Sequence, residues 1–150
     1  MRTEVVISGV PKRWFLVDAK GQVLGRLASQ VAAVLKGKNR PTYAPSTTGD
    51  YVVIVNADKI RLTGRKAQQK IYYRHSGYPG GLRATAAGTM LQRRPEYVIR
   101  EAVRGMLPKN VLGRACLRKL RIYRGDGHRH AGQQPAALAL AGRTAKGRDA

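Results

Sequence analysis

The chain has 150 residues, of which 43% are apolar, and its 29 Lys and Arg against 8 Asp and Glu give a formal net charge of +21. So high a charge opposes compaction unless an anion offsets it, and we therefore expect a polyanionic partner. The single cysteine, Cys116, excludes an intramolecular disulfide and a multi-cysteine zinc site. With neither a signal peptide nor an apolar run of roughly 20 residues, we expect a cytoplasmic protein with no membrane partner.

The first half of the chain predicts a strand, a helix and a second strand. Residues 1–13 end in a basic pair and read as an extended arm, and 14–17 form a continuously apolar run typical of a buried strand. From Leu24 apolar residues recur at helical spacings until Gly37, and 51–55 again read as a buried strand. A crossover this long predicts a right-handed parallel unit and hence an α/β fold.

The second half predicts a mixture of helices and shorter strands. Residues 70–74 are a third strand candidate, 95–107 a helix with proline in its first turn, and Asn110 the N-cap of a second short helix. Residues 120–123 alternate like a brief strand. We therefore expect an extended basic arm over 1–13, a single α/β domain over 14–124, and a flexible basic tail over 125–150.

Positive charge is concentrated in the second half of the predicted domain. Residues 59–124 hold 17 of the 29 basic groups against Glu96 and Glu101, a balance of +15. Solvated charged faces usually mix both signs, whereas a nearly pure positive face favours phosphate binding. Two rows are expected to share helix faces opposite the apolar stripes: Arg93, Arg100 and Arg104, and Arg114, Arg118 and Arg121.

The segment 72–81, with the sequence YYRHSGYPGG, interleaves aromatic, basic and glycine residues. Aromatic rings can stack on unpaired bases, and glycines let the backbone approach a ligand closely. An ordinary glycine turn with core tyrosines explains the same composition, so both interpretations stay open at this point.

Three sequence blocks resemble one family closely. They read WFLVDAKGQVLGRLASQVAA at 14–33, YYRHSGYPGGL at 72–82 and VRGMLPKNVLGRACLRKLRIYRG at 103–125, and with GDYVVIVNADKI at 49–60 the resemblance spans about residues 13–128. The family is the universal L13 ribosomal protein family. The resemblance implies a three-layer α/β/α fold around a four-stranded, mainly parallel sheet. It also implies a place on the large ribosomal subunit, binding to its rRNA, an early role in assembly and neighbouring ribosomal proteins as partners.

From the charge pattern and this resemblance we predict a structural protein with no catalytic residues, no cofactor, no metal and no small-molecule substrate. Phosphate contacts are expected from Arg and Lys, and close RNA contact from the glycine and tyrosine loop. The predicted RNA-binding residues are Lys36, Lys38, Arg40, Arg61, Arg65, Lys66, Lys70, Arg74, His75, Tyr78, Gly80, Gly81, Arg83, Arg93, Arg94, Arg100, Arg104, Lys109, Arg114, Arg118, Lys119, Arg121 and Arg124.

Three other classes of protein fit the sequence less well. A nucleotide-using enzyme could place phosphate beside Gly21 and Gly25, but their spacing is not G-x-G-x-x-G, and no P-loop motif occurs. A sequence-specific DNA binder would show a helix-turn-helix pair or zinc-finger spacing, and neither is present. Distributed phosphate contact suits folded RNA better.

A metal enzyme would need convergent acidic or histidine ligands. Asp18 and Asp58 could meet at one edge of the sheet, although capping or turn formation explains each of them better. Asp126, His128 and His130 form the one ligand-like cluster, with Cys116 nearby in sequence. A basic segment of this kind disfavours a metal site there.

Overall fold

A computed structural model describes residues 11–138. The predicted strand–helix–strand unit is present as β1 (Trp14–Asp18), α1 (Leu24–Lys36) and β2 (Tyr51–Val55). The helix ends where Gly37 adopts a φ of 83°, a left-handed conformation that glycine adopts without strain. β1 and β2 pair in parallel, with Trp14 opposite Tyr51, as the long crossover requires.

The main sheet has four strands in the order β5-β2-β1-β6, and every pairing in it is parallel. β5 (Leu120–Ile122) is the brief strand expected from the alternation at 120–123. β6 (Ala136–Ala137) comes from the segment predicted to be a flexible tail, and it pairs with the free edge of β1. The predicted α/β fold with a four-stranded parallel sheet is confirmed, while residues 125–138 belong to the sheet region and not to a free tail.

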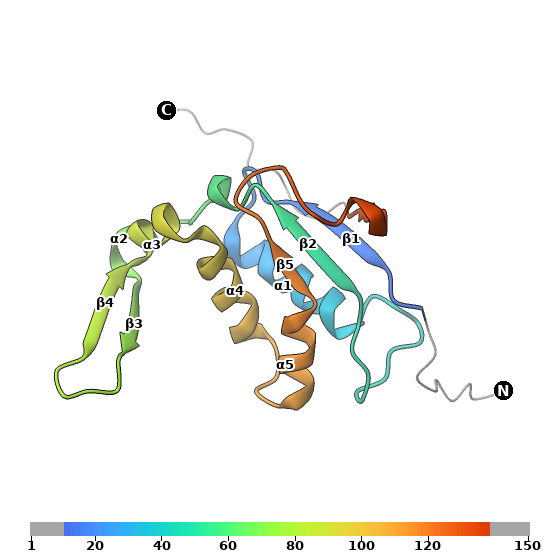
Figure 1. The fold of residues 1–150 in the computed structure, drawn as a ribbon, viewed down its shortest axis with the longest axis horizontal. Helices are drawn as coiled ribbons and strands as arrows, with labels where there is room; N and C mark the ends of the chain where they lie inside the picture. Colours follow the sequence, from blue (N-terminus) through green and yellow to red (C-terminus); the bar gives the residue numbers. More distant parts are fainter. Residues whose placement is uncertain (1–10, 139–150) are drawn as a thin grey trace.

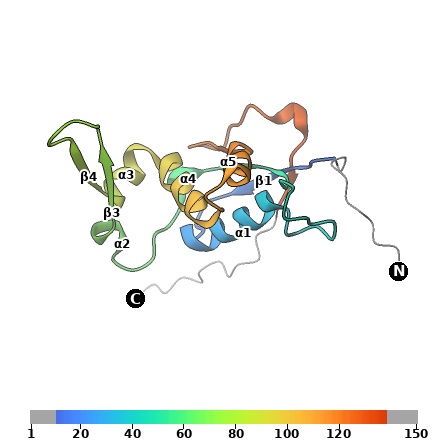
Figure 2. The ribbon, with the colours of Figure 1, turned by 90° about the horizontal axis from the view of Figure 1, so that it is seen from below.

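The helices pack on one face of this sheet. α1 contacts α4 (Pro95–Met106) and α5 (Val111–Arg118), and their apolar residues form one buried core with Val17, Val52 and Ile54 of the sheet. Figure 2 shows α1 on one side of the sheet and the orange-red segment that ends in β6 on the other. That segment includes η2 (Ala131–Gln133), a single 3₁₀ turn. Because successive side chains of a strand point to opposite faces, the sheet can pack against the helices on one face and against this segment on the other.

Local signals set the ends of the last two helices as expected. Pro95 occupies the first turn of α4, where its missing N–H is not needed. Asn110 caps α5, because its side-chain oxygen accepts a hydrogen bond of 2.8 Å from the N–H of Gly113. Both predictions are confirmed.

Most of the chain between η1 (Ala57–Lys59) and α4 forms a projection beside the main sheet (Figure 1). After η1 and α2 (Lys66–Gln69), it builds an antiparallel hairpin from β3 (Ile71–His75) and β4 (Leu82–Ala86), followed by α3 (Ala87–Arg93). The strand predicted over 70–74 therefore exists, but it belongs to a two-stranded sheet of its own. The remaining parts of the predicted arm and tail, 1–10 and 139–150, lie outside the described residues.

Candidate nucleic-acid interface

The first basic depression lies between the hairpin and the end of α3. Its lining includes Arg74 and Arg83 from facing strands together with Arg93 and Arg94, and its volume is about 280 Å³. Arg74 pairs directly with Arg83 across the hairpin. Like charges in this position destabilise a hairpin, so an anion bound there would offset the repulsion. We call these four arginines the hairpin pocket.

Aromatic residues form the floor beside the hairpin pocket. Tyr72 meets Tyr97 of α4 edge to face, with 6.0 Å between ring centroids, and the ammonium of Lys70 lies 5.1 Å from the centre of the Tyr72 ring. Burial raises the pKa of Tyr72 above its ordinary value. The hairpin is therefore attached to α4 through its aromatic residues, with the arginines at the rim.

A second depression of about 450 Å³ brings together cations from three elements. Arg100 comes from α4, Arg114 and Arg118 from α5, and Arg121 from β5. The predicted row of three arginines is thus brought together, although its last member lies on a strand and not on the helix. Phosphates of an RNA backbone that entered this depression would meet arginines from all three elements.

The other predicted row, Arg93, Arg100 and Arg104, is divided between two helices. Pro95 begins a new helix, so Arg93 ends α3 and does not share a face with Arg100 and Arg104. Arg104 instead forms an ion pair of 2.6 Å with Glu101 one turn earlier. The prediction of a common face for these three arginines was wrong. The spacing of the charges is compatible with one continuous helix, whereas Pro95 starts a second helix after Arg93.

A third depression, of about 640 Å³, is less purely basic. Arg61, Lys66 and Lys70 line it with Arg26 of α1, but Glu101 lies there too. Arg26 was absent from the predicted set, although its position off the apolar stripe of its helix was a usable signal. Because the signs are mixed, this surface is a weaker phosphate site than the other two.

The loop between β3 and β4 needs glycine at two positions for its own conformation. Gly80 has a φ of 72°, and a Cβ at Gly81 would lie 2.0 Å from Ser76 Oγ, so each glycine is needed for the turn itself. Gly77 donates a hydrogen bond of 2.9 Å to His75 Nδ1. Tyr78 is exposed at the tip. Thus the turn explains the two glycines without a ligand, whereas the aromatic tip stays available for contact.

Most of the predicted RNA-binding residues reach the surface. Lys36, Arg40 and Gly81 are half-buried, and Lys119 is buried with 7% exposure. The exposed members are Lys38, Arg61, Arg65, Lys66, Lys70, Arg74, His75, Tyr78, Gly80, Arg83, Arg93, Arg94, Arg100, Arg104, Lys109, Arg114, Arg118, Arg121 and Arg124.

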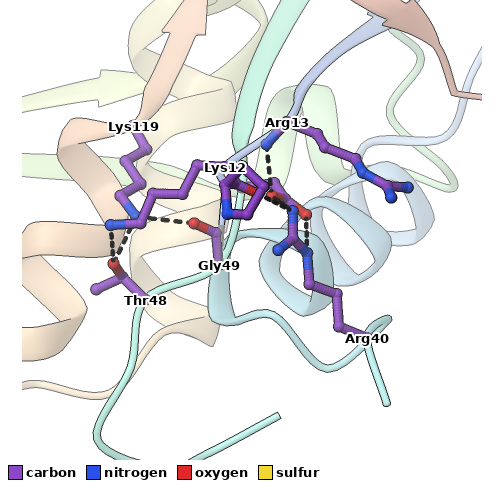
Figure 3. A network of polar contacts seen from close by, with 8 residues as sticks. Lys12, Arg13, Arg40, Thr48, Gly49 and Lys119 are labelled. Atoms are coloured by element: carbon purple, nitrogen blue, oxygen red, sulfur yellow. Dashed lines mark hydrogen bonds and ion pairs between the residues drawn. The ribbon is translucent and has the colours of Figure 1, made fainter. Parts of the chain in front are cut away.

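Arg40 is engaged inside the protein. Its guanidinium binds both carboxylate oxygens of the fully buried Asp50, with 2.9 Å from Nε to Oδ2, and donates to the carbonyl of Pro11 at 3.0 Å. The backbone N–H of Arg13 adds a further hydrogen bond to Asp50 (Figure 3). The role predicted for Arg40 needs correction, because this side chain neutralises a buried carboxylate.

Lys119 is the second internal cation. Its ammonium donates to the carbonyl of Gly49 at 2.8 Å and to the hydroxyl of Thr48, which Lys12 also approaches at 3.4 Å (Figure 3). Burial and the neighbouring Lys12 lower the pKa of Lys119 to about 8. A lysine held in this way cannot reach a phosphate, so its predicted RNA contact is withdrawn. We call Arg40, Thr48, Gly49, Asp50 and Lys119 the buried corner.

The residues considered for a metal site have other surroundings in the described part of the chain. Among residues 11–138 no group of three or more His, Cys, Asp or Glu side chains could hold a metal ion. Asp18 accepts hydrogen bonds of 2.9 Å from Asn56 Nδ2 and from the backbone of Lys20, as expected for a turn residue. His130 lies 4.9 Å from Trp14, ring centre to ring centre, and Cys116 is buried in the core.

No helix in the described part of the chain is long and apolar enough to cross a membrane.

Comparison with known proteins gives a consistent result. Residues 12–129 match the family model described as "Ribosomal protein L13". A relative from Pelobacter propionicus, named large ribosomal subunit protein uL13, is 57% identical over 93% of this chain and 100% of its own length. Relatives of the same name from Trichlorobacter lovleyi and Herpetosiphon aurantiacus are 58% and 54% identical, covering 93% and 90% of this chain and 100% and 94% of their own.

Proposed function

Because the chain belongs to the ribosomal protein L13 family, we propose that it is a structural constituent of the large ribosomal subunit that binds and stabilises folded 23S rRNA. Members of this family are structural ribosomal proteins and not enzymes. The proposal places the protein on cytoplasmic ribosomes, beside other large-subunit proteins.

The observation that carries the RNA-binding part of the proposal is the hairpin pocket. Four arginines from three segments converge there, and two of them face each other across the hairpin. Among the described residues that line this depression, none is acidic. Such an arrangement lowers the stability of the free protein and is offset when phosphates enter, which links folding to binding.

The second depression supports the same function from another side of the molecule. Arg100, Arg114, Arg118 and Arg121 sit on rigid elements whose apolar faces are in the core. Fixed arginines of this kind suit the phosphates of a folded RNA, which are themselves held in place. Two such surfaces allow one protein to join separate RNA segments, and we propose that this bridging acts early in subunit assembly.

The second depression also gives a quantitative test. Replacing Arg114, Arg118 and Arg121 together by Gln should leave the fold intact and weaken binding to 23S rRNA. Each lost phosphate contact should reduce the slope of log affinity against log salt by about 0.7–0.9, so the triple variant should lose about 2 to 3. Filter binding across a series of KCl concentrations measures this slope.

A control variant separates phosphate contact from general charge. Lys20, Lys59 and Arg129 are exposed and lie outside the three depressions, so replacing them together by Gln removes an equal number of positive charges elsewhere on the protein. If the two triple variants show the same salt slope, the second depression has no specific role in RNA binding.

The ribosomal location has its own test. The native protein in a cell extract should sediment with the large subunit at ordinary magnesium and salt concentrations. Its absence from that fraction would overturn the proposed function as a whole. For the role in assembly, the protein should already be present in the precursor particles of the subunit, and its appearance only in mature particles would contradict an early role.

A further inference from the structure

The hairpin has two faces of opposite chemistry. The pairing places Tyr72 opposite Thr85 and Arg74 opposite Arg83, so these four side chains share one face, which lies toward α3 and α4. The alternate residues share the other face: Ile71, Tyr73, His75, Leu82, Ala84 and Ala86. None of these six is Lys or Arg. We call this second set the apolar face.

The apolar face is uncovered in the described structure. Tyr73 is 64% exposed, Leu82 60% and Ile71 44%. The hairpin projects away from the main sheet (Figures 1 and 2). Arg74 and Arg83 line the depression beside α3 and α4, and Tyr73 lies at the same depression. Ile71 and Leu82 are not among its lining residues. Large apolar side chains gathered on one exposed sheet face mark a surface that another molecule covers.

Charge indicates what that molecule is. In a chain of net charge +21, the cations of this hairpin lie on the opposite face, and His75 is the one titratable group of the apolar face besides the Tyr73 phenol. Such a surface offers no cation to a phosphate, whereas an uncharged apolar surface of a protein complements it. We propose that the hairpin is a two-sided connector, with rRNA on its arginine face and an apolar patch of another large-subunit protein docked on Ile71 and Leu82.

This inference rests on the proposed function, because the second protein is one that the large subunit holds nearby. It differs from the expectation that the whole loop packs into RNA, since it assigns the alternate side chains of the same strands to different partners. The two proposals can be separated because each face can be changed alone.

Cross-linking in purified large subunits tests the placement directly. A diazirine-bearing amino acid replaces Leu82 or, in separate subunits, Thr85 on the arginine face. We expect the probe at position 82 to link to another large-subunit protein and the probe at 85 to link to rRNA. The connector is overturned if position 82 links to rRNA, links to a second copy of this chain, or gives no product in subunits that contain the protein.

Paired variants test the energetics. Because Ile71 and Leu82 are exposed and do not line the hairpin pocket, replacing both by Ser should leave the fold and the affinity for protein-free rRNA unchanged within about twofold. In competition with the unaltered protein, this variant should enter large subunits about tenfold less well, from loss of apolar contact with the second protein.

The matched variant carries Arg74→Gln and Arg83→Gln and should lose about tenfold in affinity for protein-free rRNA. Equal loss of rRNA affinity in both variants would show that the apolar face binds RNA and would overturn the connector. If neither variant is found in subunits and the unaltered protein is absent as well, the proposed function fails instead.

Discussion

The buried corner and the hairpin pocket hold the same kinds of side chain in opposite circumstances. In the buried corner, Arg40 is matched to Asp50, and Lys119 has accepting oxygens from Thr48 and Gly49. In the hairpin pocket, Arg74 and Arg83 face each other without a carboxylate in the lining. The paired cations of the buried corner stabilise the folded state. The arginines of the hairpin pocket repel one another and lower the stability of the free protein, and a bound anion would remove this repulsion. Net charge alone does not separate the two groups.

The largest expected effect comes from breaking the buried ion pair. Asp50→Ala leaves the guanidinium of Arg40 without its carboxylate in a largely buried site, so the free energy of unfolding should fall by about 3–5 kcal/mol. Urea denaturation measures this loss. As a control, Glu101→Gln removes the partner of the exposed Arg104 and should cost less than about 1 kcal/mol. Equal losses in the two variants would contradict the distinction between buried and exposed pairs.

A close backbone contact should give the next largest effect. A Cβ on Gly49 would lie 2.2 Å from the carbonyl oxygen of Val34 and 2.3 Å from the amide nitrogen of Gly37, so Gly49→Ala must displace the end of α1. We expect a loss of about 2–4 kcal/mol. Gly105 in α4 has open space around it, and Gly105→Ala should instead raise stability by up to about 1 kcal/mol. Thermal unfolding of both variants checks the opposite signs.

Lys119 makes stability depend on pH. Its folded-state pKa of about 8 lies below the ordinary value of 10.5, so the unfolded chain binds more protons between these pH values. Stability contributed by this group should therefore rise with pH from about 8 to 10.5, by at most about 1.4 kcal/mol per unit. Urea titrations at several pH values measure this rise.

The comparison for this prediction is Lys119→Met, which fills the same space without a charge and should lack the rise. Burial raises the pKa of the Cys116 thiol, which acts in the opposite direction above its ordinary pKa of 9.0. Both proteins should therefore carry Cys116→Ala. The same pH profile in both would exclude Lys119 as the source of the dependence.

The smallest effect is also the one with the unexpected sign. Replacing Arg74 and Arg83 by Gln relieves a like-charge pair, so the free protein should become more stable by about 0.2–1 kcal/mol. Added salt should stabilise the unaltered protein more than this variant, because screening relieves the same repulsion. Urea denaturation at low and high KCl gives both quantities. A loss of stability on substitution would mean that these arginines support the fold.

Much of the fold could be predicted because local patterns encode it. The apolar stripe of α1, the proline that opens α4 and the capping Asn110 each act within a few residues. The strand β6 could not be found in this way. Two alanines carry no strand pattern, and their pairing is supplied by the free edge of β1 far away in the chain.

The candidate interface was predictable as a set of exposed cations but not in its exceptions. Arg40 and Lys119 look like every other basic residue in the sequence, and the tertiary structure alone places Asp50 and Gly49 beside them. The two faces of the hairpin follow from its register, which could not be assigned because only the first strand, over 70–74, was predicted and its partner β4 was not.

The position of β6 determines when the sheet can be finished. Its partner β1 is the first strand of the described residues, so the outermost strand is added only after residues 136–137 have left the tunnel of the ribosome that makes the protein. Trp14 is the single tryptophan, stacked on Tyr51 with 4.4 Å between ring centres and near His130 from the late segment. Its fluorescence can therefore follow this closing step in real time.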